Sequence, residues 1–128
     1  MRYLRNNEAV LSGRLFERSM TENRLAVEDF FGLAAASGFT GVELRDSQIL
    51  PGGDAGTVRE LCAKYGLRVS MLTARTGRLD DEASFERFRE YLLLAEQLNC
   101  PRLKVGGNRT GLLRRAAEHA EGRGVRIG

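Results

Sequence analysis

The sequence is poor in cysteine and proline, has no tryptophan, and has no long hydrophobic run. It contains two cysteines and two prolines among 128 residues. No apolar stretch approaches the roughly 18 residues that a membrane span needs. Residues 1–7 carry charge but lack the apolar segment of a secretion signal. These absences exclude a disulfide-rich scaffold, and they predict a cytoplasmic protein with no membrane partner.

The two cysteines, Cys62 and Cys100, have no second Cys or His at the spacing of metal ligands. Cys62 lies on the apolar stripe of an expected helix, and Cys100 precedes Pro101 at a helix end. This pattern predicts two buried or half-buried free thiols. The only histidine, His119, falls late in another expected helix, where we expect it to be solvated. The sequence also lacks a Ser–His–Asp set and a phosphate-loop motif.

Charge is plentiful but mixed. Eighteen arginines and two lysines stand against 17 acidic residues, which gives a net charge of +3. Basic and acidic residues alternate and form no block, so the sequence disfavours a nucleic-acid partner. Hydrophobic residues make up 42% and charged residues 29%, as in an ordinary globular protein.

Short apolar strands and amphipathic helices alternate along the chain. Strands are predicted at residues 39–45, 67–73, 102–107 and 124–128, with a less marked one within 9–16. Helices are predicted over residues 27–37, 54–65, 81–99 and 110–121, the second capped by Asp54. The strand anchors Val42, Val69, Leu103 and Val125 are 27, 34 and 22 residues apart, which is the length of successive strand–helix units.

This pattern predicts an α/β fold of parallel strand–helix repeats, four pairs and the start of a fifth strand. It is equivalent to the first half of a TIM barrel, whose full length is about 250 residues. No linker or change of composition divides the chain, so we expect residues 1–128 to form a single partial domain that stops at its fifth strand.

Three segments carry a family resemblance. They are residues 33–45 (LAAASGFTGVELR), 61–69 (LCAKYGLRV) and 94–105 (LAEQLNCPRLKV). Together they resemble the first half of the xylose isomerase-like TIM barrels, which include sugar phosphate isomerases and epimerases and the related apurinic endonucleases. The resemblance spans most of the chain from about residue 25.

The resemblance implies a fold and an activity. A full-length member is expected to bind a divalent metal (Mn, Mg, Zn or Co) and to move a proton or hydride between neighbouring carbons of a sugar or sugar phosphate. Its metal ligands lie on later strands, so we expect no cofactor in this chain and no activity from it alone. The endonuclease branch also uses His near the ends of its second and third strands, where this chain has Arg45 and Thr73. The endonuclease function is therefore disfavoured.

Alternation within the strands places charged side chains inside the expected barrel. Glu43 and Arg45 share one face of their strand, and Lys104 faces the same way from another. One hypothesis is that Glu43 and Lys104 shape a substrate pocket in which Arg45 meets a phosphate or carboxylate. The alternative is that Glu43 and Lys104 form a buried structural ion pair.

Polar residues at the carboxyl ends of strands are the other candidates for substrate binding. Asp46 lies on the expected loop after residues 39–45, with Ser47 and Gln48, and Thr73 ends the next strand. Gly107 and Asn108 precede a helix whose amides could bind an anion, although a plain turn explains the Gly-Gly pair as well.

Two further functions remain open. The chain could be a non-catalytic half-barrel that self-associates through exposed sheet edges, as a homodimer or by pairing with a missing C-terminal half. A flavodoxin-like module would need a phosphate loop that the sequence does not contain.

Overall fold

The described residues form a sheet whose strand order follows the sequence. The computed structural model describes residues 2–3, 9–16, 18, 20, 26–49, 55–74, 78–107 and 110–127. The six strands are, in order, β1 (Arg2–Tyr3), β2 (Ala9–Ser12), β3 (Gly41–Arg45), β4 (Arg68–Ala74), β5 (Arg102–Val105) and β6 (Arg126–Ile127). The strands β2 to β6 are parallel, which confirms the predicted α/β architecture. The short strand β1, which pairs antiparallel with β2, was not predicted.

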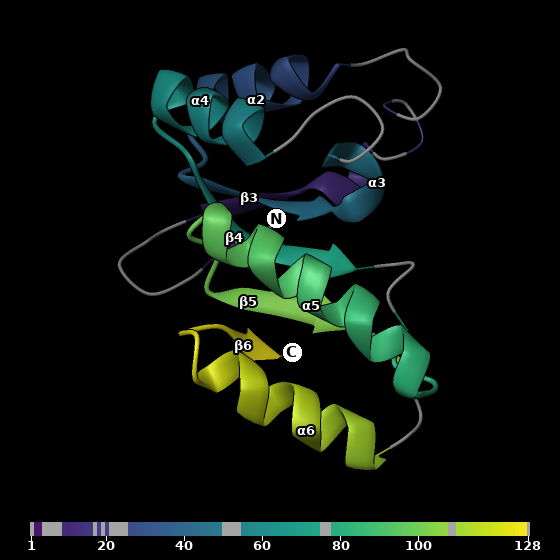
Figure 1. Cartoon of the computed structure of the whole chain (residues 1–128). Helices are drawn as coiled ribbons and strands as arrows, with labels where there is room; N and C mark the ends of the chain where they lie inside the picture. Colours follow the sequence, from purple (N-terminus) through teal and green to yellow (C-terminus); the bar gives the residue numbers. More distant parts are fainter. Residues whose placement is uncertain are drawn as a thin grey trace.

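Helices supply the crossovers that parallel neighbours require. They are α2 (Val27–Ala36), α3 (Asp46–Ile49), α4 (Ala55–Tyr65), α5 (Glu82–Gln97) and α6 (Thr110–Glu121), with a short 3₁₀ turn, η2 (Gly13–Leu15), after β2. Figure 1 shows α2 and α4 side by side and α5 lying across β4 and β5. The four long helices match the predicted ones to within a few residues, and the predicted cap Asp54 lies outside the described residues.

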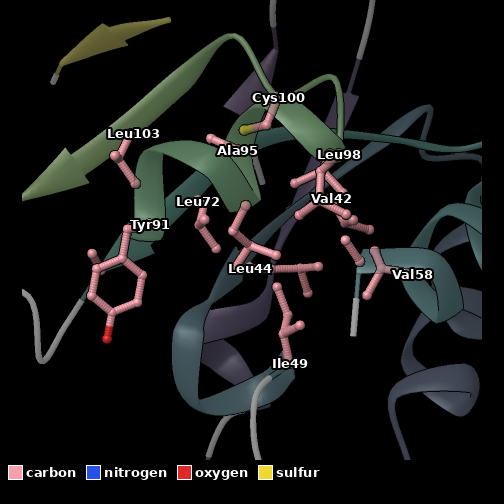
Figure 2. Packing of buried hydrophobic residues seen from close by; sticks show 14 of the residues in the cluster. Val42, Leu44, Ile49, Val58, Leu72, Tyr91, Ala95, Leu98, Cys100 and Leu103 are labelled. Carbon is pink, nitrogen blue, oxygen red and sulfur yellow. The ribbon is translucent and has the colours of Figure 1, made fainter. Parts of the chain in front are cut away.

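The hydrophobic core lies between the sheet and these helices. Val42, Leu44, Leu72 and Leu103 are at most 1% exposed, and they come from three adjacent strands. Figure 2 shows them packed with Val58 of α4, Ala95 of α5 and Leu98, the residue that follows α5. Full burial of one such side chain stabilises the fold by about 1.5–3 kcal/mol, so this layer fixes which face of each strand is turned toward the helices.

The four long helices end in the same way. One residue with positive φ follows each helix, and the next residue donates its amide to a carbonyl five positions back. These donor–acceptor pairs are Phe39 to Ala34 (3.0 Å), Leu67 to Cys62 (3.0 Å), Cys100 to Ala95 (2.8 Å) and Val125 to Ala120 (3.0 Å). Three of the positive-φ residues are glycines, and the fourth is Asn99 with a φ of 54°. The repeated turn sends each helix directly into the next strand.

The helix starts are less uniform. At α5, Asp81 accepts a hydrogen bond from the Ser84 amide at 2.9 Å, as a capping side chain should. At α2 the capping position is Ala26, which has no side-chain oxygen, and the Ala26 amide instead donates to the Asp29 carboxylate at 3.1 Å. This helix therefore begins without a side-chain cap, and the hydrogen bond to Asp29 partly offsets that loss.

Candidate functional site

The sheet face away from the core carries polar side chains, as the alternation predicts. We call it the open face. Val42 and Leu44 pack against the helices, whereas Glu43 and Arg45, half-buried, project from the other side of β3. The open face is made of half-buried or exposed side chains from five strands: Ser12, Glu43, Arg45, Arg68, Ser70, Met71, Thr73, Arg102, Lys104 and Arg126.

A pocket of about 160 Å³ lies at the carboxyl-terminal end of the open face. Backbone pairing sets Arg45 beside Thr73 and Thr73 beside Lys104, so the three side chains form a row across β3, β4 and β5. The full lining is Ser12, Arg14, Glu43, Leu44, Arg45, Met71, Thr73 and Lys104. The structure thus brings together four residues that the sequence predicts for substrate binding, from three different strands.

The pocket combines three cationic side chains with one carboxylate and two hydroxyls. A guanidinium can bind a phosphate or carboxylate through two parallel hydrogen bonds, and the ammonium of Lys104 adds a mobile positive charge. The hydroxyls of Ser12 and Thr73 can donate to and accept from sugar hydroxyls. The arrangement suits a small polar ligand that carries negative charge.

The expected buried pair of Glu43 and Lys104 is not formed. Lys104 is exposed and Glu43 only half-buried, and no ion pair joins them in the described part of the chain. Register explains the difference, because Lys104 lies level with Thr73 whereas Glu43 lies level with Met71. A bulge at Ser70, whose hydroxyl donates to the Val42 carbonyl at 3.3 Å, shifts the pairing between β3 and β4.

Asp46 lies apart from the pocket. It begins the short helix α3, where a loop was expected, and only 2% of its surface is exposed. Its carboxylate accepts hydrogen bonds from the Tyr91 hydroxyl at 2.8 Å and from the Ser47 amide at 2.9 Å. Figure 2 shows Tyr91 extending its hydroxyl beyond the apolar cluster. In this conformation the Asp46 carboxylate tethers α3 to α5 rather than lining the pocket.

Gln48, also expected on a loop, holds two strand ends together. Its side-chain oxygen accepts from the Arg45 amide at 2.9 Å, and its side-chain amide donates to the Gly13 carbonyl at 2.8 Å. A Cβ at Gly13 would lie 2.4 Å from that oxygen and 2.6 Å from the Glu43 carbonyl, so only glycine allows this close approach. Sequence reasoning missed this clamp, which fixes the rim of the pocket near Arg14 and Arg45.

The Gly106–Gly107 turn packs tightly against the chain before α5. The Leu79 amide donates to the Gly106 carbonyl at 2.9 Å, and a Cβ at Gly107 would lie 2.7 Å from the Leu79 carbonyl oxygen. This contact favours the structural explanation of the glycine pair over anion binding. Asn108, predicted to bind substrate with Gly107, lies outside the described residues.

The two cysteines and the histidine lie outside the pocket, among packed side chains. Cys62 and Cys100 are free thiols, as predicted, and burial raises the pKa of Cys100 to about 11. His119 is half-buried, where a solvated side chain was expected, with its ring 6.2 Å from that of Phe85. Within the described ranges, no three His, Cys, Asp or Glu side chains come together as a metal site would need.

Comparison with known proteins identifies the architecture. No family model and no curated protein matches the chain. Among solved structures, a xylose isomerase domain containing protein from Salmonella typhimurium LT2 matches over 99% of this chain and 50% of that one, with a TM-score of 0.75 and 18% identity. The chain has the fold of half a xylose isomerase-like TIM barrel.

Two other structures match the half-barrel over a similar extent. A sugar phosphate isomerase/epimerase from Parabacteroides distasonis ATCC 8503 has a TM-score of 0.68 at 13% identity, over 94% of this chain and 50% of that one. The IOLI protein, solved with a zinc atom, has a TM-score of 0.71 at 14% identity, over 93% and 49%. The half-barrel therefore spans about half the length of these proteins. None of its described helices is long and apolar enough to cross a membrane.

Proposed function

We propose that the half-barrel supplies part of the substrate-binding wall of a sugar or sugar phosphate isomerase or epimerase. The row of Arg45, Thr73 and Lys104 carries this proposal, because it lies at the carboxyl ends of parallel strands. Barrel enzymes bind their substrates at that end. The names of the matched structures supply the reaction class, and the cations of the row suit the phosphate of such a substrate.

A complete site would need residues beyond those described. Glu43 is the one carboxylate among the described residues of the open face, and a divalent metal in a protein site usually takes several oxygen or nitrogen ligands. The described residues therefore do not fit a metal centre of their own. A metal, whether Mn, Mg, Zn or Co, would be held by ligands from a complementary half of the barrel, and no acid or base is assigned to this chain.

Ligand titration tests the proposed pocket. In two-dimensional NMR spectra, we expect glucose 6-phosphate to shift the backbone amides of Arg45, Thr73 and Lys104, and glucose alone to shift them less. Charged hydrogen bonds contribute about 1.5–3 kcal/mol each. Lys104→Gln should therefore weaken binding by about tenfold or more.

The chain offers a matched control, because Lys64 is its only other lysine and lies on the surface of α4. Lys64→Gln should leave the affinity for glucose 6-phosphate unchanged. Equal weakening by both substitutions, or shifts that avoid the row, would contradict the proposed pocket.

A second candidate function is self-association through the edge of β6. This strand is last in the sheet and pairs with β5 alone in the described chain, whereas β1 covers the opposite edge. An unpaired edge offers backbone groups to another strand, and two copies can pair through it about a two-fold axis. Light scattering after gel filtration should then report twice the chain mass, and a monomer at every concentration tested would remove this candidate.

A further inference from the structure

Three arginines gather at the amino-terminal end of the open face, opposite the row of Arg45, Thr73 and Lys104. Arg68, Arg102 and Arg126 are the first residues of β4, β5 and β6. Arg102 and Arg126 are direct partners in the parallel pairing of β5 with β6. Neighbouring strands lie about 4.8 Å apart, so two guanidinium groups project side by side from adjacent backbones.

This placement is unfavourable without a negative partner, because like charges directly opposite each other destabilise a sheet. Both side chains are exposed, and neither forms an ion pair or side-chain hydrogen bond with a described residue. Two other arginines, one on α6 and one in the turn after it, do have acidic partners. Arg115 lies 2.7 Å from a Glu82 oxygen, and Arg123 lies 3.1 Å from a Glu96 oxygen.

A pocket of about 350 Å³ lies between these arginines, within the range of about 300–1,000 Å³ that is typical of small-molecule sites. The side-chain amide of Asn99 adds a polar group, since Asn99 and Pro101 form its rim just before β5. Glu43 is the single acidic residue of the lining, at the end shared with the carboxyl-terminal pocket. The lining is Glu43, Arg68, Val69, Ser70, Met71, Asn99, Pro101, Arg102 and Arg126.

We propose that this pocket binds a small oxyanion that carries at least two negative charges, held between Arg102 and Arg126 with Arg68 at its side. Guanidinium forks match phosphate and carboxylate oxygens in pairs, which an ammonium does not do. A bound anion would also remove the repulsion between the two in-register arginines. The three arginines lie at the opposite end of the strands from the substrate pocket, and Glu43 and Met71 are the lining residues that the two pockets share.

Calorimetric titration with inorganic pyrophosphate at low ionic strength tests the site. A second titration with citrate distinguishes recognition of phosphate from recognition of carboxylate. We expect wild-type chain to bind at least one of the two anions, and Arg102→Gln with Arg126→Gln to weaken that binding at least tenfold. The control pair, Arg87→Gln with Arg114→Gln, makes the same chemical change on exposed positions of α5 and α6 and should leave the affinity unchanged.

Folding of the double variant is checked by thermal unfolding without anion. It should be at least as stable as wild type, because a like-charge pair has been removed. Equal binding by the double variant, or equal binding of chloride at matched ionic strength, would overturn the proposal. In NMR spectra pyrophosphate should shift the backbone amides of Arg102 and Arg126, and these shifts should persist in Lys104→Gln, which alters the carboxyl-terminal pocket. The experiments can thus disprove the anion site without disproving the substrate pocket, and the reverse.

Discussion

At the residue scale, hydrogen bonds of buried polar side chains fix the backbone next to the carboxyl-terminal pocket. The carboxylate of Asp46 and the side-chain amide of Gln48 lie just behind the row, and both are satisfied by hydrogen bonds. A buried polar atom that loses its partner keeps the cost of its desolvation. The backbone around Arg45 therefore depends on contacts that do not themselves touch the pocket.

Tyr91→Phe tests this dependence. The substitution removes the hydroxyl that lies 2.8 Å from the Asp46 carboxylate, and it should lower the free energy of unfolding by about 1–3 kcal/mol. Urea denaturation measures the change. Tyr65→Phe is the matched control, because its hydroxyl donates to the exposed Glu28 carboxylate and should contribute much less. Equal losses in the two variants would contradict a special role for the buried bond.

Glu28, Lys64 and Tyr65 form a hydrogen-bonded group on the surface, and its contribution to the free energy of unfolding depends on pH. Hydrogen bonds from Lys64 and Tyr65 lower the pKa of the Glu28 carboxyl below 4.5, and the Glu28 carboxylate raises the pKa of Lys64 above 10.5. For Glu28, the stabilisation is present above 4.5 and is lost as the pH falls through the lowered pKa. The stability difference between wild type and Glu28→Gln should therefore vanish in acid. A difference that persists after Glu28 is protonated would contradict this linkage.

At the element scale, the repeated helix-to-strand turn makes the fold sensitive to one residue per unit. Gly66 has a φ of 65°, and no atom lies within 4 Å of where its Cβ would be. Gly66→Ala thus isolates the backbone strain from any clash, and it should destabilise the chain by about 1–2 kcal/mol. Asn99→Gly relaxes the same conformation and should be neutral or slightly stabilising in the same denaturation assay. A neutral Gly66→Ala would show that this turn is not strained.

The sequence predicts the regular elements well because their signals are local. Alternation within five residues suffices to put Glu43 and Arg45 opposite Val42 and Leu44. The helix α3 could not be predicted in this way, because the burial of Asp46 depends on Tyr91, which is 45 residues away. The bulge at Ser70 likewise arises from strand pairing, and it decides that Glu43 lies level with Met71 rather than with Ser70.

At the scale of the whole molecule, charge limits how two copies can associate. The described strands of the open face carry five cations, Arg45, Arg68, Arg102, Lys104 and Arg126, against Glu43 alone. Two copies closed face to face would enclose ten such cations with two carboxylates, and burying unpaired charge is strongly unfavourable. On the functions proposed above, a complementary half that brings carboxylates would suit this face better than a second copy, and self-association would use the sheet edge.

The substitution Ile127→Pro distinguishes association through the edge of β6 from association through the open face. The Arg126 amide donates inward to the Pro101 carbonyl at 2.9 Å, so the next amide along the strand, that of Ile127, points away from β5. Proline at 127 removes this outward donor and spares the pairing of β5 with β6. A dimer formed through the edge should dissociate in the variant by analytical ultracentrifugation. A dimer that survives the substitution and tightens in high salt would indicate contact through the charged faces instead.

The strand order follows the chain order, and this affects how the protein is made. From β2 to β6, each strand pairs with the one synthesised just before it, so no pairing in this parallel array has to wait for a distant segment. Contacts between sequence neighbours cost little loop-closure entropy and favour fast folding. A chain emerging from the ribosome can therefore add one strand–helix unit at a time, with Val42 and Leu44 already under α2 and α4 before β5 and β6 exist.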